Sequence, residues 1–106
     1  MEYSIAKKDL EQIRSEIKEN PTMFQNYHYL QELQAMKNLK KYGQGAITYV
    51  GNFLKEAVLV KEELIESVWV NVFNILSIEN LKPSQRYNQP SLFDSLQKWI
   101  NWSLSI

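Results

Sequence analysis

Apolar side chains recur every three or four residues between Glu62 and Ile78, and together they cover most of the circumference of a helix. A strand is the alternative, because valines alternate with other residues on both sides of Trp69. The pattern runs well past the ~5–6 residues of a usual strand, and its first turn is rich in glutamate, which suits the positive end of a helix dipole. We therefore predict a helix over residues 62–78 and expect it to be the most buried element of the protein.

Four further segments carry apolar residues at helical spacing, and three of them follow a capping residue. They span residues 4–20, 23–41, 46–57 and 92–104. The expected caps are Ser4, Thr22 in a T-x-x-Q box and Ser91 in an S-x-x-D box. The fold class predicted is all-α, a compact orthogonal or up-down bundle of about five helices that forms one domain over residues 1–106. The third and fourth helices are expected to be antiparallel neighbours, because their connection is short.

The first predicted helix has a narrow apolar stripe made by Leu10, Ile13 and Ile17. A narrow stripe is typical of a helix at the edge of a bundle. It is also typical of the seam between two helices, so a homodimer through this helix is an alternative.

Three glycines lie between or within the segments of apolar helical pattern. Gly43 and Gly45 lack the lysine and hydroxyl residue that complete a phosphate-binding loop, so we interpret them as a helix cap and turn, or as a point of close helix packing. Gly51 lies inside the third predicted helix, where glycine costs about 1 kcal/mol relative to alanine. Its expected use is to let a bulky neighbour such as Trp69 approach the backbone.

Two segments favour contact with another protein. Residues 79–90 contain two prolines and few apolar residues, which predicts a long loop, and Arg86 and Tyr87 are residue types that dominate protein interfaces. The alternative is that both side chains only hold the loop against the domain. The chain also ends in an apolar segment that includes Trp102 and Ile106, which we expect either to fold back or to be covered by a partner.

Composition narrows the functional classes. Twelve basic and twelve acidic residues give a net charge of zero, which argues against a strongly basic nucleic-acid binder and against an acidic mimic of DNA. The absence of cysteine excludes disulfides, thiolate catalysis and cysteine-ligated zinc. The N-terminus is charged where a signal peptide needs its apolar core, and no stretch offers ~20 apolar residues for a membrane span, so we expect a cytoplasmic protein.

Catalytic chemistry finds little support in the sequence. His28 is the only histidine, and the hypothesis that Glu32 orients it as a general base competes with a simple surface histidine. Glu62, Glu63 and Glu66 lack the spacing of a cation-binding loop and are better explained as the acidic start of a helix. We therefore predict a protein that is not an enzyme and has no catalytic residues, no metal site and no cofactor.

A resemblance to an uncharacterised bacterial all-helical family extends from about Tyr49 to Trp102. It is carried by N-F-L-x-E-A at residues 52–57, V-K-E-E-L-I at residues 60–65, L-K-P-S-Q-R at residues 81–86 and an aromatic closing helix around Trp99. Members of that family often carry a membrane helix that this sequence lacks. The resemblance implies an all-helical fold and no particular activity.

The function predicted from these observations is a non-enzymatic protein-binding module that occludes a protein partner, of the inhibitor, antitoxin, immunity or phage-encoded accessory type. The candidate contact residues are Arg86, Tyr87, Trp102, Tyr27 and Tyr42. The alternative is a nucleic-acid-binding helical protein that uses the basic patch Lys37, Lys40 and Lys41 beside Tyr42. A homodimer is compatible with the first hypothesis.

Overall fold

The centre of the fold is helix α5, Glu66–Asn80, which buries both of its large aromatic side chains, Trp69 and Phe73. A computed structural model describes residues 2–106 of the chain. Within them it contains six α-helices, three short 3₁₀ helices and no strand, so the predicted all-α class is confirmed. The helix with the largest number of buried residues, eight in α5, also lies where the sequence predicts the most buried helix, although it begins at Glu66 rather than Glu62 and ends at Asn80 rather than Ile78.

The later start of α5 follows from how the preceding helix ends. Helix α4, Gln44–Leu59, closes with hydrogen bonds from Lys61 N to Val58 O and from Glu62 N to Ala57 O, each 3.0 Å long. This pair of bonds is the Schellman pattern, which requires a left-handed residue, and Lys61 accordingly has a φ of 57°. Residues 60–65 therefore form a connection and cannot belong to either helix.

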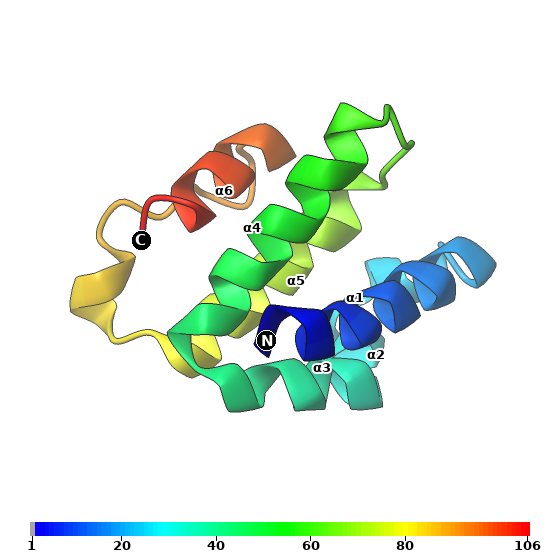
Figure 1. The fold of residues 1–106 in the computed structure, drawn as a ribbon, viewed down its shortest axis with the longest axis horizontal. Coiled ribbons are helices and arrows are strands. Elements are labelled where there is room, and N and C mark those ends of the chain that lie inside the picture. The colour runs from blue at the N-terminus through cyan, green and yellow to red at the C-terminus, as the bar shows by residue number, and fades with distance from the viewer. Residues whose placement is uncertain (1) are drawn as a thin grey trace.

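Helices α4 and α5 run antiparallel and side by side, as their short connection predicts (Figure 1). Helix α6, Leu96–Ser103, is the last helix of the chain and packs across α4. Gly51 makes this contact close, because a Cβ at Gly51 would overlap the hydroxyl of Ser103 and lie 3.1 Å from its Cβ. The expectation that Gly51 admits Trp69 is therefore wrong, and the neighbour that it admits belongs to α6.

Helix α1, Glu2–Glu19, covers the opposite side of α4 and begins two residues before the predicted cap Ser4. Its apolar stripe of Ala6, Leu10, Ile13 and Ile17 is completely or almost completely buried against α3 and α4. The stripe therefore has its partner within the monomer, and this helix offers no uncovered seam for a homodimer.

The single helix predicted over residues 23–41 is four short elements. They are η1 (Met23–Gln25), α2 (Tyr27–Glu32), α3 (Gln34–Leu39) and η2 (Lys40–Tyr42). The predicted cap Thr22 is itself helical and makes no capping bond, whereas Asn26 caps α2 by accepting a 2.9 Å hydrogen bond from His28 N. A second break occurs at Leu33, whose ψ of 133° is extended. These breaks let Phe24, Leu30 and Met36 all face the core.

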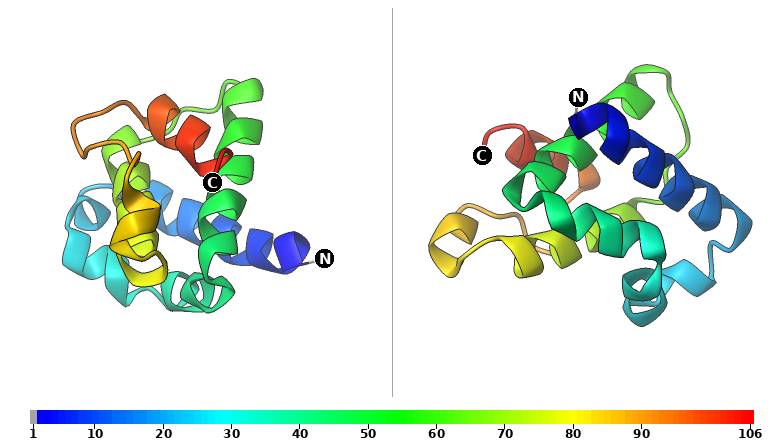
Figure 2. Two further views of the ribbon diagram at one scale, coloured as in Figure 1. Left: turned by 90° about the vertical axis from the view of Figure 1, so that its left-hand side faces the viewer. Right: turned by 60° about the horizontal axis from the view of Figure 1, so that its bottom comes forward.

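The turn at Gly43 and the long connection after α5 lie where the sequence predicts them, whereas the last helix begins later in the chain than predicted. Gly43 has a φ of 60° and forms the predicted turn, after which α4 begins at Gln44. The connection from residue 81 to residue 95 contains the short helix η3, Pro83–Arg86, which lies at the margin of the molecule (Figure 2). The last helix begins at Leu96 rather than Leu92, because Ser95 is the residue whose hydroxyl caps it, by accepting from Lys98 N.

Candidate functional site

Large apolar side chains are exposed in two short runs, one where α4 ends and one where the chain leads into α6. Val58, Leu59 and Val60 form the first run, and Leu92 and Phe93 form the second. A single exposed apolar residue on a surface is common, whereas a local group of them marks an interaction site.

A groove of about 260 Å³ opens beside these residues. Its lining comes from the end of α4, the connection before α5, the first residue of α5 and the first two turns of α6. The lining residues are Val58, Leu64, Glu66, Leu96, Gln97 and Ile100. The carboxylate of Glu66 accepts a 3.2 Å hydrogen bond from Leu96 N and so ties the start of α6 to the start of α5. The groove is therefore a fixed feature between three elements rather than a gap beside a loose loop.

Phe93 is the most exposed side chain of this group, with 100% of its surface accessible, and it projects from an ordered turn. Ser91 N donates to Asp94 Oδ2 at 2.8 Å, and Phe93 N donates to the Ser91 hydroxyl at 3.2 Å. The indole of the buried Trp99 donates to Ser91 O at 3.0 Å and joins the turn to the core. This turn, residues 91–94, is called the Phe93 turn below.

Electrostatics reinforce the Phe93 turn. The pKa of Asp94 is lowered from its ordinary value of 3.8, chiefly because its carboxylate accepts the hydrogen bond from the backbone of Ser91 and also because it accepts one from Lys98. The Lys98 ammonium lies 3.1 Å from Asp94 Oδ1, four residues along the chain. At neutral pH the carboxylate of Asp94 is ionised, and it accepts these hydrogen bonds in the folded turn.

The sequence-predicted contact residues do not form one surface. Tyr87 is 88% exposed and fits a role in binding, whereas the neighbouring Arg86 is half-buried. Tyr27 lies on α2 and Tyr42 on η2, where the Tyr42 ring packs edge-on against Tyr49 with the ring centroids 5.6 Å apart.

Trp102 corrects the prediction most clearly. Only 7% of its surface is accessible, and its ring lies edge-on to Trp99 at a centroid distance of 5.7 Å. The apolar C-terminal segment therefore folds back onto the protein, which is the first of the two outcomes expected for it, and Trp102 presents no surface to a partner.

Two of the three lysines in the alternative basic patch have acidic neighbours. Lys37 Nζ lies 3.6 Å from a Glu32 carboxylate oxygen, and Lys40 Nζ lies 3.7 Å from one of Glu79. These pairs reduce the positive field that would attract phosphate groups. Binding of nucleic acid through Lys37, Lys40 and Lys41 stays a prediction without a supporting feature in the fold.

Comparison with family models, with curated proteins and with solved structures finds no match. The resemblance to a bacterial helical family stays a prediction. Within residues 2–106, no helix is both long enough and apolar enough to cross a membrane.

Glu62 and Glu66 each bind a structural partner elsewhere in the fold. Glu62 Oε1 accepts from Arg14 at 3.2 Å, and Glu66 accepts from the backbone at the start of α6. In the part of the chain that the structure describes, no group of three histidine, aspartate or glutamate side chains is placed to hold a metal ion.

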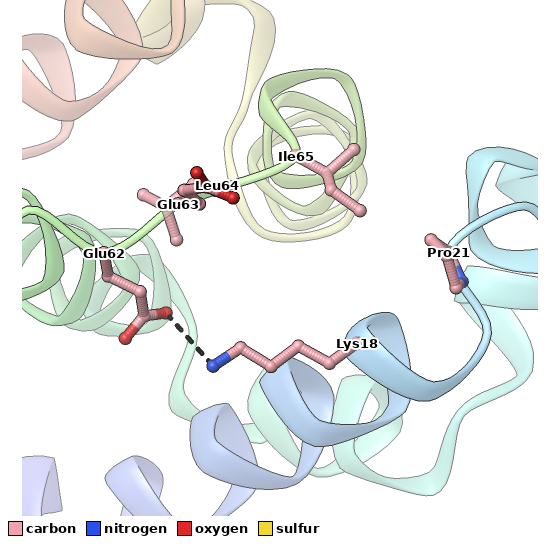
Figure 3. A pocket seen from close by; sticks show the side chains of 6 residues that line it. All are labelled: Lys18, Pro21, Glu62, Glu63, Leu64 and Ile65. Atoms are coloured by element: carbon pink, nitrogen blue, oxygen red, sulfur yellow. Dashed lines mark ion pairs between the residues drawn. The ribbon is translucent and has the colours of Figure 1, made fainter.

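Glu62 also borders a second cleft of about 450 Å³, between the end of α1 and the connection before α5, which is lined by both charged and apolar side chains (Figure 3). The Lys18 side chain extends toward Glu62 across this cleft, with its ammonium 4.0 Å from Glu62 Oε2. Pro21, Glu63, Leu64 and Ile65 complete the lining. Because both signs of charge pair within the cleft, its geometry selects no ligand class.

Sequence reasoning missed the Phe93 turn because the S-x-x-D pattern has two readings. Ser91 and Asp94 match a capping box that opens a helix, which would place Phe93 inside that helix beside the core. The signal that the helix begins later is Ser95, a second capping residue directly after Asp94. It permits the box to close as a separate turn before the helix begins.

Proposed function

We propose that the chain is a non-enzymatic protein-binding module that occludes a protein partner through the Phe93 turn and the groove beside it. The observation that carries this proposal is the complete exposure of a phenylalanine on a turn held by backbone and side-chain hydrogen bonds. The hydrogen bonds fix the backbone that carries the ring, so only the two side-chain torsions of Phe93 have to be ordered when a partner buries it. Large aromatic side chains dominate the energetics of protein interfaces.

The surroundings of the turn support the same proposal. Val58, Leu59 and Val60 add exposed apolar surface at the end of α4, and the groove offers a place for an apolar side chain of the partner. Tyr87 is a further exposed ring, and it lies on the connection that leads to the turn. An apolar centre bordered by polar groups is the usual anatomy of a protein interface.

The test is capture of partners from source-cell lysate by the purified chain tagged at its N-terminus, followed by mass spectrometry. We expect one stoichiometric protein to be retained by the wild-type chain and lost with Phe93→Ser. Because Phe93 makes no buried contact, this substitution should leave the free energy of unfolding unchanged within about 0.5 kcal/mol.

A matched control is Tyr29→Ser, which also removes an exposed aromatic ring but does so on α2, outside the proposed surface. It should retain the partner at the wild-type level. Retention of the same partner by Phe93→Ser would refute the assignment of the surface. Recovery of many proteins that is lost after nuclease treatment would refute the function and favour the nucleic-acid alternative.

A further inference from the structure

The groove between the end of α4 and the start of α6 combines aliphatic walls with a single charged side chain. Val58, Leu64 and Ile100 contribute aliphatic surface, and Glu66 is the only charged residue among the described residues of the lining. A wholly apolar side chain that filled the groove would cover this carboxylate without pairing it, and burial of an unpaired charge is costly. The groove therefore favours an occupant that has both an aliphatic part and a positive charge.

The carboxylate of Glu66 can accept a further partner. Its Oε1 accepts the 3.2 Å hydrogen bond from Leu96 N, which is the only hydrogen bond that the described residues donate to this side chain. No basic side chain within residues 2–106 forms an ion pair with Glu66. Lys98, the basic residue of α6, pairs with Asp94 at 3.1 Å instead. Because an ionised carboxylate has about four acceptor positions, Oε2 of Glu66 is open to a cation.

Gln97, the other polar residue of the lining, also offers an acceptor. Its amide nitrogen donates a 3.0 Å hydrogen bond to Asn101 Oδ1 along α6. This orientation leaves the amide oxygen of Gln97 as the group that can bind a ligand. Two acceptors, one of them charged, match an ammonium or guanidinium group, which carries several N–H donors and a positive charge.

We infer that the groove accepts a lysine or arginine side chain of the protein partner, with its aliphatic stem against the walls and its cationic end on Glu66. Long basic side chains bury their methylene groups against apolar surface while the charged end reaches a polar group. An apolar cavity of about 150 Å³ is enough to bind benzene, so a groove of about 260 Å³ has room for such a stem. The inference rests on the proposed function, because it names a residue class of the same partner.

The fold prepares the carboxylate for this contact. The hydrogen bond from Leu96 N restricts the Glu66 side chain before any ligand arrives. Much of the cost of an exposed ion pair is the ordering of two long side chains, and here one of them is already ordered. The contact would therefore add specificity for a basic residue to the apolar binding of the Phe93 turn.

The experiment is an NMR titration of the purified chain with n-butylammonium, which reproduces the end of a lysine side chain. The probe is added from about 1 mM to about 100 mM at constant ionic strength, the range expected for so small a ligand. We expect saturable shifts of the backbone amides of Leu96 and Gln97. The neutral probe n-butanol should bind at least about tenfold more weakly, because it cannot pair with the carboxylate. Titration with n-propylguanidinium in parallel distinguishes arginine from lysine as the preferred residue.

A variant of Glu66 tests the charge without removing the hydrogen bond between α5 and α6. Glu66→Gln keeps an oxygen that can accept from Leu96 N, and it should bind n-butylammonium about tenfold more weakly than the wild type. The matched control is Glu63→Gln, which removes the same charge from the connection before α5 but does not line the groove. It should bind the probe like the wild type, and urea denaturation of both variants checks that they fold.

Equal affinity of the wild-type chain for n-butanol and n-butylammonium would overturn the inference, because the carboxylate would then contribute nothing. This comparison uses the unchanged chain and so does not depend on the folding of a variant. The absence of saturable shifts at Leu96 and Gln97 with both cationic probes would overturn the inference as well.

The protein captured from lysate separates this inference from the proposed function. Glu66→Gln should lower the affinity for that protein about tenfold, whereas Glu63→Gln should not. Loss of the protein with Phe93→Ser together with undiminished binding by Glu66→Gln would refute the basic occupant and leave the proposed function in place. Binding of the probes by the groove when no protein is captured would refute the proposed function and, with it, a protein source of the basic group.

Discussion

Replacement of Gly51 by alanine tests the closest helix contact in the fold. A methyl group at Gly51 would overlap the Ser103 hydroxyl and would lie 3.1 Å from Ser103 Cβ and 3.2 Å from Leu104 Cδ2. Ser103 is fully buried, and its hydroxyl donates a 2.6 Å hydrogen bond to Ile100 O. Rotation of the hydroxyl would break that bond and would still leave the two carbon contacts, so α6 has to move away from α4.

The expected loss of stability combines three contributions. Overpacking of a well-packed core costs about 1–3 kcal/mol. Loss of the hydrogen bond made by Ser103 costs about 0.5–1.5 kcal/mol. Alanine in a helix interior regains about 1 kcal/mol relative to glycine. The net prediction for Gly51→Ala is a decrease of about 0.5–3.5 kcal/mol in the free energy of unfolding.

The assay is urea denaturation followed by the fluorescence of the buried tryptophans, among them Trp69 and Trp99. Ser103→Gly in the Gly51→Ala background removes the hydroxyl oxygen and Cβ of Ser103, which make the two closest contacts. The double variant should therefore be more stable than the sum of the two single effects predicts, with a coupling of about 1 kcal/mol or more.

Gly45→Ala is the matched control within the same helix. A methyl group there would lie 3.6 Å from the ring of Tyr49, which is an ordinary contact, so this substitution should stabilise the protein by up to about 1 kcal/mol. The reasoning is refuted if Gly51→Ala is as stable as Gly45→Ala, or if the effects of Gly51→Ala and Ser103→Gly add without coupling.

Two further predictions concern the residue that closes the C-terminus of α4 and the turn that precedes α6. Lys61 has a left-handed backbone, which glycine adopts without strain. Urea denaturation should therefore show that Lys61→Gly raises the free energy of unfolding by about 0.5–1 kcal/mol and that Lys61→Ala does not. Equal stability of the two variants would contradict the strain at Lys61. The lowered pKa of Asp94 means that the ionised carboxylate stabilises the fold above pH 3.8, its ordinary pKa, and that this contribution is lost as the pH falls through the lower folded value. The protection factor of the Ser91 amide, which is its intrinsic exchange rate divided by the rate measured by NMR at the same pH, should fall in that acidic window for the wild type but not for Asp94→Asn. A protection factor that is unchanged with pH would contradict the role of the carboxylate.

Much of the fold follows from periodicity along the chain. The apolar patterns around Trp69, Leu10 and Ile47 predict three of the six α-helices and the side chains that they bury, because a helix repeats its faces every 3.6 residues whatever it packs against. The turn at Gly43 and the antiparallel pairing of α4 with α5 follow from equally local signals, namely a residue that tolerates a positive φ and a short connection.

Other features depended on contacts between segments far apart in sequence. Residues 22–41 carry one continuous helical pattern, yet the chain breaks at Asn26 and Leu33 so that their apolar side chains reach the same core. From the sequence, Trp102 is one of several apolar residues near the C-terminus that could be exposed. It is buried only because α6 packs across α4.

The candidate binding surface shows the same division. The sequence by itself determined an all-helical protein with a central helix, predicted over residues 62–78 and found at 66–80, and a polar connection after it. Only the tertiary structure decided that Phe93 is exposed, that Gly51 faces Ser103, and that the end of α4 and the first turn of α6 enclose a groove. The physical reason is that periodicity describes one element at a time, whereas exposure and grooves arise from the way in which several elements pack together.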